Sequence, residues 1–346
     1  MTAQSEIAGK TPIVLLGSTA SGKSGIAMEL ARESARVPGG GQEIEIISAD
    51  SMCVYQQMDI GTAKPTTEDQ SEVPHWCLDL IDPAEEYTVS RYQQDVAAAL
   101  ENIQSRGVQP LIVGGTGLYI RAIVDAIQMP GQFPEVRASL EDEGDTATLY
   151  TQLCDHDPLA AKRMEPTNRR RIVRALEVTL GSGRRFSSYG EGLDTYGHTA
   201  FRQIGLRLPR PQLDERIEQR FAHQLELGLV DEAWELHTRP EGLSRTARQA
   251  LAYKELFAHF RGEFSLEEAI ELAKARTRRF SRRQERWFRR DPRICWIDID
   301  IDIDQDQDPM EALPAVRAEL EQCLEARVRS VPEGSKRCEV KAGGVR

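Results

Sequence analysis

The sequence predicts an α/β fold in which a parallel sheet is flanked by helices and a mostly helical domain is inserted. Two observations predict this class. Short apolar runs alternate with helical patterns early in the chain and return after residue 200, and strands that alternate with helices form parallel βαβ units. Between about 129 and 200 the segments are helical and charge-rich, without strand patterns, so we expect a separate helical domain there.

Three strand-and-helix pairs account for the first part of the chain. The strand patterns are PIVLLG, EIEIISAD and PLIVGG, and the helical patterns are SGIAMELARES, RYQQDVAAALENIQ and LYIRAIVDAI. They predict, in chain order, strands at 12–17, 43–50 and 110–115 and helices at 24–34, 91–104 and 118–127.

The sheet resumes after the insertion. FRQIGLRLP at 201–209 and RICWIDI at 293–299 predict two further strands, and helices dominate between them. We therefore expect a core domain of residues 1–128 and 201–310, with residues 129–200 inserted as the helical domain.

Two segments near the C-terminus have an unusual composition. The run IDIDIDIDQDQD at 297–308 carries a carboxylate at every second position, which favours a solvated loop. Residues 327–346 mix Gly, Pro, Lys and Arg, and we expect a disordered tail there.

Composition excludes several classes of protein. Hydrophobic residues make up 40% of the 346 residues, which is enough for a core and excludes wholesale disorder. No window approaches the roughly 18 apolar residues of a membrane helix, and the polar start MTAQSEIAGK has no signal-peptide pattern. Six cysteines without a C-x-x-C pair indicate reduced thiols. We expect a cytoplasmic protein that is not bound to a membrane.

A phosphate-binding loop follows the first predicted strand. Its sequence is G-x-x-x-x-G-K-S, set between a strand and a helix, the context in which this motif cradles phosphates with backbone N–H groups and a helix N-terminus. Lys23 would bridge the phosphates, and the Ser24 hydroxyl would ligate Mg²⁺. The loop residues are Gly17, Ser18, Thr19, Ala20, Ser21, Gly22, Lys23 and Ser24.

Two other strand ends carry polar residues. The second predicted strand delivers Asp50 and Ser51, and the third delivers Thr116 between glycines. Ligands of such sheets bind beyond the carboxyl ends of the strands, so Asp50 and Thr116 are expected on the same edge as Lys23. From the residues alone, Asp50 could instead cap a turn or assist Mg²⁺, and Thr116 could be a helix N-cap.

A helix over 265–290 is predicted by the capping box that Ser265 and Glu268 form. A semi-apolar stripe follows one face and arginines follow another; from Arg276 to Arg293 nine arginines stand against two acidic residues, in a chain of net charge −11. A second basic cluster, Arg169–Arg171 with Arg174, lies in the insertion. The two clusters suggest that the protein binds the phosphate backbone of a nucleic acid from two sides. The alternative is a solvated helix whose arginines pair with acidic neighbours.

The sequence resembles the bacterial tRNA dimethylallyltransferases, or IPP transferases, which prenylate N6 of the adenine just 3′ of the anticodon. The matching stretches follow the family's order over about residues 12–298, and MDIGTAKP is far more specific than the phosphate loop. They are GSTASGKS, DSMCVYQQMDIGTAKP, PHWCLDLIDP, PLIVGGTGLYIRA, RRRIVRALEV, RIEQRF, AYKEL and TRRFSRRQERWFR.

The resemblance implies a P-loop NTPase-like core, dimethylallyl diphosphate as donor, Mg²⁺ as cofactor and the tRNA anticodon stem-loop as partner. It implies a monomer with no obligate protein partner. By motif position, the loop with Lys23 and Ser24 would hold the diphosphate, Arg220 would touch it, Asp50 would be the general base at N6, and Thr116 would line the site. The residues implied to lie against tRNA are Asp50, Ser51, Met52, Cys53, Arg170, Arg171, Arg174, Arg282, Arg283, Arg286 and Arg289.

The sequence departs from the family's pattern at three places. Cys53 stands where the family usually has Gln, Ala252 stands where it has Gly, and Thr167-Asn168 replaces an Asn-Asp pair. Three other functions remain open: a small-molecule kinase that uses the loop on ATP, a prenyltransferase of free adenine nucleotides, and a non-catalytic RNA-binding protein.

Overall fold

The computed structural model describes residues 10–36, 43–190, 193, 195–299, 313–318 and 340–341. The chain divides into two compact units. Unit 1 comprises residues 1–124 and 198–346, and unit 2 comprises residues 125–197.

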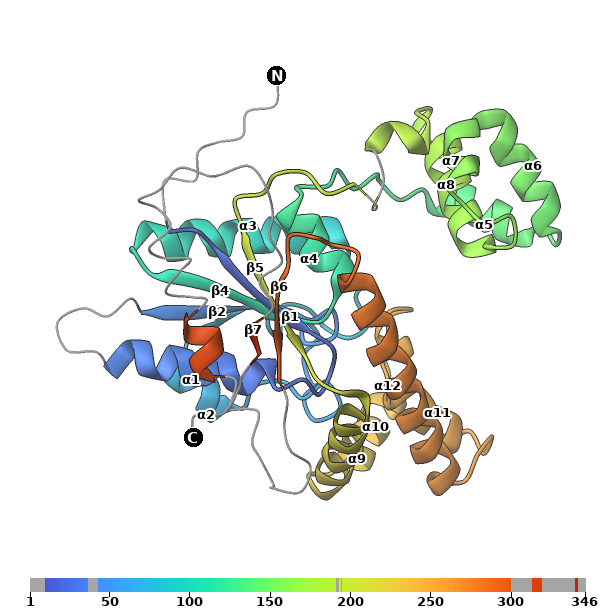
Figure 1. The fold of residues 1–346 in the computed structure, drawn as a ribbon. Coiled ribbons are helices and arrows are strands. Elements are labelled where there is room, and N and C mark those ends of the chain that lie inside the picture. The colour runs from blue at the N-terminus through green and yellow to red at the C-terminus, as the bar shows by residue number, and fades with distance from the viewer. Residues whose placement is uncertain are drawn as a thin grey trace. The chain divides into compact units, whose positions relative to one another are not determined.

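Unit 1 is built on a seven-stranded sheet whose strand pairs are all parallel, in the order β3-β2-β4-β1-β5-β6-β7 (Figure 1). The strand β1 lies near the middle and is buried along its whole length. The strands are β1 (Ile13–Gly17), β2 (Ile44–Ala49), β3 (His75–Trp76), β4 (Gln109–Gly114), β5 (Arg202–Arg207), β6 (Cys295–Asp298) and β7 (Val340–Lys341). The predicted α/β fold class is confirmed.

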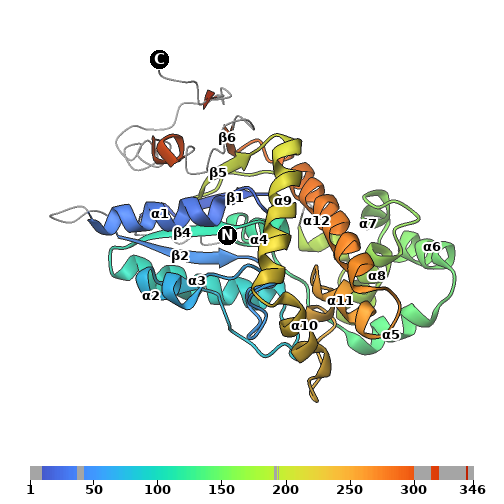
Figure 2. The ribbon, with the colours of Figure 1, turned by 90° about the horizontal axis from the view of Figure 1, so that it is seen from below.

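Helices cover both faces of this sheet. Alternate residues of β1 enter two separate cores: Val14 and Leu16 pack with α3 and α4, whereas Ile13 and Leu15 pack with α1, as the period of two in a strand requires. Figure 2 shows α1 and α3 on opposite sides of the sheet. The helices of unit 1 are α1 (Lys23–Arg36), α2 (Thr67–Glu72), α3 (Val89–Ser105), α4 (Gly117–Val124), α9 (Arg210–Glu226), α10 (Leu229–Thr238), η2 (Ala247–Gln249), α11 (Tyr253–Phe260) and α12 (Leu266–Phe288).

The predicted elements occur with small differences at their ends. The helix expected over 118–127 ends at Val124, and Ala126 beyond it has a left-handed φ of 46° that an α-helix cannot accommodate. The short elements β3 and α2 were not predicted, because two and six residues are too few to show a period.

Unit 2 consists of helices: α5 (Pro134–Asp142), α6 (Thr146–His156), α7 (Pro158–Lys162), α8 (Arg169–Ser182) and η1 (Phe186–Tyr189). Its own core includes Leu149 and Leu153 of α6 and Ile172 and Leu176 of α8. The buried carboxylate of Glu177 accepts a hydrogen bond from the Phe133 amide at 2.9 Å and so fixes the start of α5 to α8.

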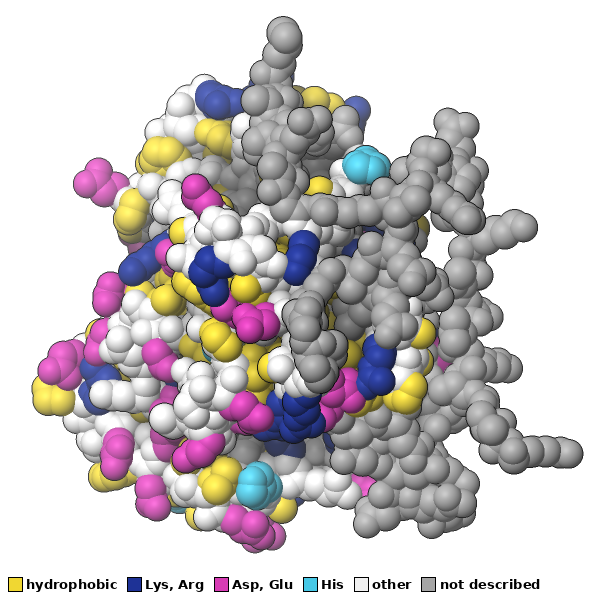
Figure 3. All heavy atoms as spheres, turned by 90° about the vertical axis from the view of Figure 1, so that its left-hand side faces the viewer, with side chains coloured by type: hydrophobic (Ala, Val, Ile, Leu, Met, Phe, Trp, Pro, Cys, Tyr) yellow, Lys and Arg dark blue, Asp and Glu magenta, His cyan; other side chains and the backbone are white. Residues whose placement is uncertain are grey.

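Some expectations fall on residues that the structure does not describe. The acidic run beyond Ile299 lies outside the described residues, and so does the expected tail at 327–346 apart from β7. Within the described part of the chain, no helix is long and apolar enough to cross a membrane. Acidic side chains are spread over the face drawn in Figure 3, with basic ones between them, in keeping with the net charge of −11.

Candidate active site

A cavity of about 550 Å³ opens in unit 1 where the phosphate loop meets the carboxyl ends of β2 and β4. Side chains from α9 and α12 complete its wall. The predicted site residues that line it are Thr19, Lys23, Ser24, Asp50, Ser51, Met52, Cys53, Thr116, Arg220 and Arg283. Residues from five separate stretches of the sequence thus meet in one place.

The phosphate loop joins β1 to α1, as the motif predicts. Its backbone takes left-handed φ values at Ala20 (64°) and Gly22 (84°), which lets the chain wrap tightly. A Cβ at Gly17 would lie 2.7 Å from Ser21 Oγ, so the loop needs glycine there. Backbone amides of a loop and the N-terminus of a helix are the groups that favour anions, and both are present here.

Lys23 is the cation of this loop. Its Nζ donates a hydrogen bond to Ser18 O at 3.1 Å. Burial lowers the pKa of Lys23 to about 8, the Asp50 charge opposes this change, and the nearby Arg220 charge adds to it. The lysine therefore loses its proton more readily than an exposed one, unless an anion binds beside it.

Asp50 and Thr116 lie at the ends of the neighbouring strands β2 and β4. Asp50 Oδ1 accepts a hydrogen bond from the Met52 amide at 2.8 Å, and Thr116 Oγ1 accepts one from the Ser51 amide at 3.1 Å. One Asp50 oxygen thus caps the turn that follows β2, which agrees with the alternative that Asp50 caps a turn. The second makes no hydrogen bond within the described part of the chain, so it is open to a ligand.

Arg220 reaches the loop from α9. Its Nη1 donates to Thr19 Oγ1 at 2.9 Å. Burial lowers the pKa of Arg220, and the Asp50 charge opposes this shift. Because guanidinium stays protonated in proteins, Arg220 and Lys23 bring positive charge to the same cavity as the Asp50 carboxylate.

The family-specific run MDIGTAKP forms a scaffold beside the cavity. Glu232 of α10 accepts hydrogen bonds from the amides of Asp59, Ile60 and Gly61 at 2.8–3.1 Å, and Tyr253 donates to the same carboxylate at 2.5 Å. A Cβ at Gly61 would lie 2.5 Å from the Tyr253 ring. The two motifs MDIGTAKP and AYKEL therefore hold each other in place.

Lys64, in the same run, also has a structural role. Its side chain is 3% exposed, and its Nζ contacts the carboxylates of Asp59 and Asp79 at 2.5 Å and Tyr55 O at 2.8 Å. Lys64 lines the cavity but uses its donors to hold the loop.

Cys53 is buried in the cavity wall. Burial and the Asp50 charge raise the pKa of its thiol, so the sulfur is a neutral, unreactive group at neutral pH.

Ala252 has φ 69° and ψ −52°, a left-handed conformation that costs a residue with a Cβ roughly 1–3 kcal/mol. Replacing Ala252 by Gly should relieve this strain and offset the lost methyl burial of about 0.8 kcal/mol. Ala250 is similarly buried, with an ordinary φ of −57°. We expect Ala252→Gly to be at least about 1 kcal/mol more stable than Ala250→Gly, as measured by urea unfolding. Equal losses in the two variants would contradict strain at Ala252.

The arginines of α12 divide into two groups. Some are paired with acidic residues: Arg276 with Glu255, Arg278 with Glu218, Arg289 with Glu285, and Arg293 after the helix with Asp291. Among the described residues no ion pair is found for Arg279, Arg282, Arg283 and Arg286, and Arg283 lines the cavity. Acidic neighbours thus pair with some of these arginines, Arg289 among them. The four arginines without such a pair in the described part of the chain form a basic surface.

The predicted RNA-contacting arginines of unit 2 also differ from one another. Arg174 donates to Glu177 and to Pro130 O, both at 2.8 Å, and so holds unit 2 together. Arg170 and Arg171 are exposed, and neither forms an ion pair within the described ranges.

Sequence reasoning missed the contacts of Gln284 in the cavity wall and of Glu232 and Tyr253 beside it. Gln284 lies on the semi-apolar stripe of its helix, yet its Oε1 accepts from the Thr19 amide 265 residues away. A glutamine buried in a stripe of mostly apolar residues is the signal that could have pointed to such a role.

The donor groups present suit Mg²⁺ bound with a substrate. Within the described residues no group of three or more His, Cys, Asp or Glu side chains could hold a metal alone. Mg²⁺ commonly takes one or two protein oxygens and fills its shell with phosphate and water. The Ser24 hydroxyl lines the cavity and fits that pattern as the one protein ligand.

Comparison with known proteins gives consistent matches. The family model "IPP transferase" matches residues 53–291. The chain is 45% identical over 294 residues to a tRNA dimethylallyltransferase of Kineococcus radiotolerans, covering 82% of this chain and 90% of that one. It is 44% identical over 291 residues to the Thermobifida fusca protein of the same name, covering 83% and 89%.

Solved structures agree in fold. The tRNA isopentenylpyrophosphate transferase of Bacillus halodurans superposes with a TM-score of 0.63 at 33% identity, covering 92% of this chain and all of that one. A eukaryotic dimethylallyltransferase that acts on tRNA superposes at 0.72, covering 95% and 82%, and its 24% identity supports the fold alone.

Proposed function

The chain belongs to the IPP transferase family of prenyl-transferring enzymes, and we propose that it transfers a dimethylallyl group from dimethylallyl diphosphate to N6 of the adenine just 3′ of the anticodon in tRNA, releasing diphosphate. One observation carries this proposal: an anion-binding loop, two cations and a carboxylate with one open oxygen line a single cavity. The cavity can hold a leaving diphosphate and an incoming amine together.

The diphosphate would lie on the loop, where charge develops as the bond to the allylic carbon breaks. Loop amides, Lys23 and Arg220 would be the donors there, and preorganised donors of this kind stabilise developing negative charge. Mg²⁺, held by Ser24 and the diphosphate, would neutralise further charge on the leaving group.

Asp50 would act on the nucleophile. The N6 lone pair is delocalised into the adenine ring, so the amine needs alignment with the allylic carbon and removal of a proton as the bond forms. The N6–carbon bond forms, the carbon–oxygen bond breaks with its electrons leaving on diphosphate, and the N6 proton passes to the open oxygen of Asp50. Thr116, which holds the Ser51 amide, keeps the turn around Asp50 in place.

The RNA would be held by phosphate contacts. The four arginines of α12 without ion pairs in the described ranges, and the exposed Arg170 and Arg171 of unit 2, supply the cations. The target adenine must leave its stack at a cost of a few kcal/mol, as is usual for enzymes that modify a base.

Incubation with labelled dimethylallyl diphosphate and either tRNA, AMP or no acceptor tests the proposal. We expect label in tRNA alone, at one adenine beside the anticodon. Label in AMP would favour the prenyltransferase of free nucleotides, and phosphate transfer from ATP to a small molecule without prenyl transfer would favour a kinase.

The pKa of Lys23 predicts how activity depends on pH. Only the ammonium form attracts diphosphate, and in the free enzyme that form is lost as pH rises through about 8. We therefore expect kcat/KM for the donor to fall roughly tenfold per pH unit above this value, whereas kcat changes less because bound diphosphate stabilises the ammonium. In Lys23→Arg the alkaline fall should disappear, since guanidinium stays charged. A flat wild-type profile from pH 7 to 9.5 would disprove this role of Lys23.

A further inference from the structure

We propose that Gln284 is a positioning residue of the transfer reaction, which fixes the phosphate loop to the end of β4 from the arginine-bearing helix α12. The inference rests on the proposed function for its meaning in catalysis. The effect of Gln284 on diphosphate binding can be measured whether or not the protein has the proposed function.

The side-chain amide of Gln284 bonds to two loops at once. Oε1 accepts from the Thr19 amide at 2.9 Å, and Nε2 donates to Gly115 O at 2.8 Å. The residue is 8% exposed, so both bonds are made away from bulk water, where losing a partner leaves an unsatisfied polar group. One amide therefore links the loop that follows β1 to the loop that follows β4.

The local sequence is shaped to admit this contact. A Cβ at Gly115 would lie 2.5 Å from Gln284 Nε2, and a Cβ at Gly117 would lie 2.3 Å from the Trp287 ring. Two glycines of the strand-end run thus let α12 approach closely through side chains one helical turn apart. Thr116 lies between those glycines, so the docking of α12 also fixes the hydroxyl that holds the Ser51 amide.

The bond to Thr19 determines how the phosphate loop can present its amides. The Thr19 amide donates a hydrogen bond to Gln284, and the Thr19 hydroxyl accepts one from Arg220. Thr19 is therefore held on its backbone by α12 and on its side chain by α9. With this residue fixed, the remaining loop amides and Lys23 are preorganised for the anion, which strengthens binding.

Gln284→Met tests the proposal, because methionine keeps the length and volume of the side chain but forms neither bond. Calorimetric titration with Mg²⁺-pyrophosphate should show a Kd raised roughly 5- to 50-fold, the range expected for one or two lost bonds in a buried setting. The KM for dimethylallyl diphosphate should rise with it, while the KM for tRNA stays within about twofold. A matched control is Gln109→Met, which should leave this Kd unchanged: Gln109 is also buried and donates to Thr11 O at 2.9 Å, but it lies at the start of β4, outside the cavity lining.

Two further variants separate positioning from a general loss of folding. Gly115→Ala should displace Gln284 by its Cβ and raise the pyrophosphate Kd in the same direction, even if Gln284→Met fails to fold. Thr19→Val removes the bond to Arg220, and its effect should be non-additive with that of Gln284→Met if both act through Thr19. A pyrophosphate Kd equal to wild type in a folded Gln284→Met or Gly115→Ala variant would overturn the inference. Absence of prenyl transfer by the wild type would refute the proposed function and leave this test standing.

Discussion

Asp50→Asn should lower kcat for prenyl transfer by about 100- to 10,000-fold, the usual contribution of a placed general base. Asparagine keeps the oxygen that accepts from the Met52 amide, so the turn at the end of β2 should survive. What it loses is the second oxygen as a proton acceptor. Single-turnover assays with saturating donor and tRNA measure this loss directly, and Asp50→Ala should lower kcat at least as far.

Asp69→Asn is the matched control for this experiment. Asp69 lines the same cavity, and as asparagine it can still cap α2. Its kcat should stay within about threefold of wild type, since its carboxylate accepts from the Thr66 amide and hydroxyl at the start of α2. Affinity for tRNA should change little in either variant. Full turnover in Asp50→Asn would remove this carboxylate from the mechanism and require another base.

Reversing Arg282 and Arg283 together to glutamate should weaken tRNA binding on the order of 100-fold at 50 mM salt. Each phosphate contact contributes roughly −0.7 to −0.9 to the slope of log K against log salt. Losing two contacts should therefore change the slope by about 1.4–1.8. At low salt it should lower the affinity about tenfold per contact. Filter binding across a salt series measures both quantities. kcat at saturating tRNA should fall much less than the affinity.

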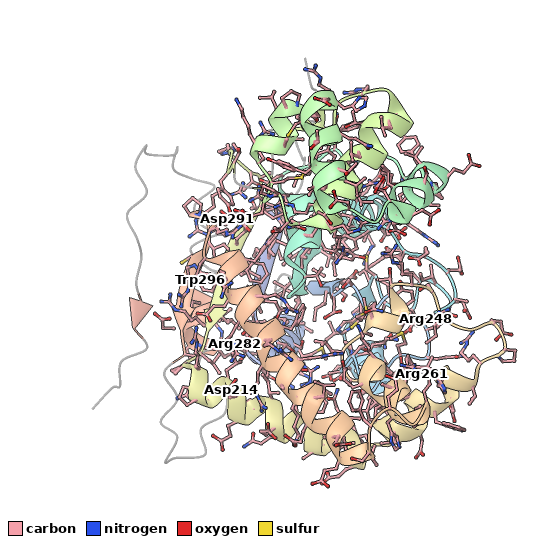
Figure 4. The ribbon with its side chains drawn as sticks, turned by 90° about the vertical axis from the view of Figure 1, so that its right-hand side faces the viewer. Asp214, Arg248, Arg261, Arg282, Asp291 and Trp296 are labelled. Carbon is pink, nitrogen blue, oxygen red and sulfur yellow. The ribbon has the colours of Figure 1, made fainter. Side chains whose placement is uncertain are left out.

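Arg261→Glu serves as the control, because it makes the same charge change as either single variant. Figure 4 shows Arg261 on the segment that follows α11 and Arg282 on α12. Arg261 already pairs with Glu263 at 2.7 Å, so its reversal should leave the salt slope unchanged. A double variant of Arg282 and Arg283 with the wild-type slope would mean that this face of α12 does not contact the RNA backbone.

The fold, and the meeting of Lys23, Asp50 and Thr116 in one cavity, could be predicted because they depend on local patterns joined by a topological rule. The apolar run before Gly17 and the helical pattern after Ser24 identify a strand, a loop and a helix. Once β2 and β4 are taken as parallel to β1, Asp50 and Thr116 must lie at the same edge, and the structure has them there.

The scaffold of the site could not be predicted in the same way. Glu232 holds three amides about 170 residues earlier in the chain, and Gln284 holds one 265 residues earlier. Nothing in the local period of α10 or α12 shows which backbone groups will face them, because these contacts form only when helices dock on the sheet. The resemblance indicated that MDIGTAKP and AYKEL matter, but only the packing of Gly61 against Tyr253 shows why.

The two ends of the inserted unit leave the sheet domain at neighbouring points. Thr199 Oγ1 donates to Val124 O at 2.8 Å, so the chain departs after α4 and returns before β5 across a gap that one hydroxyl spans. Unit 1 itself holds the two ends of the insertion next to each other. The entropic cost of closing the chain between them grows only slowly with the length of the insertion. Insertions or deletions within residues 125–197 can therefore be accommodated without moving the strands whose ends form the cavity.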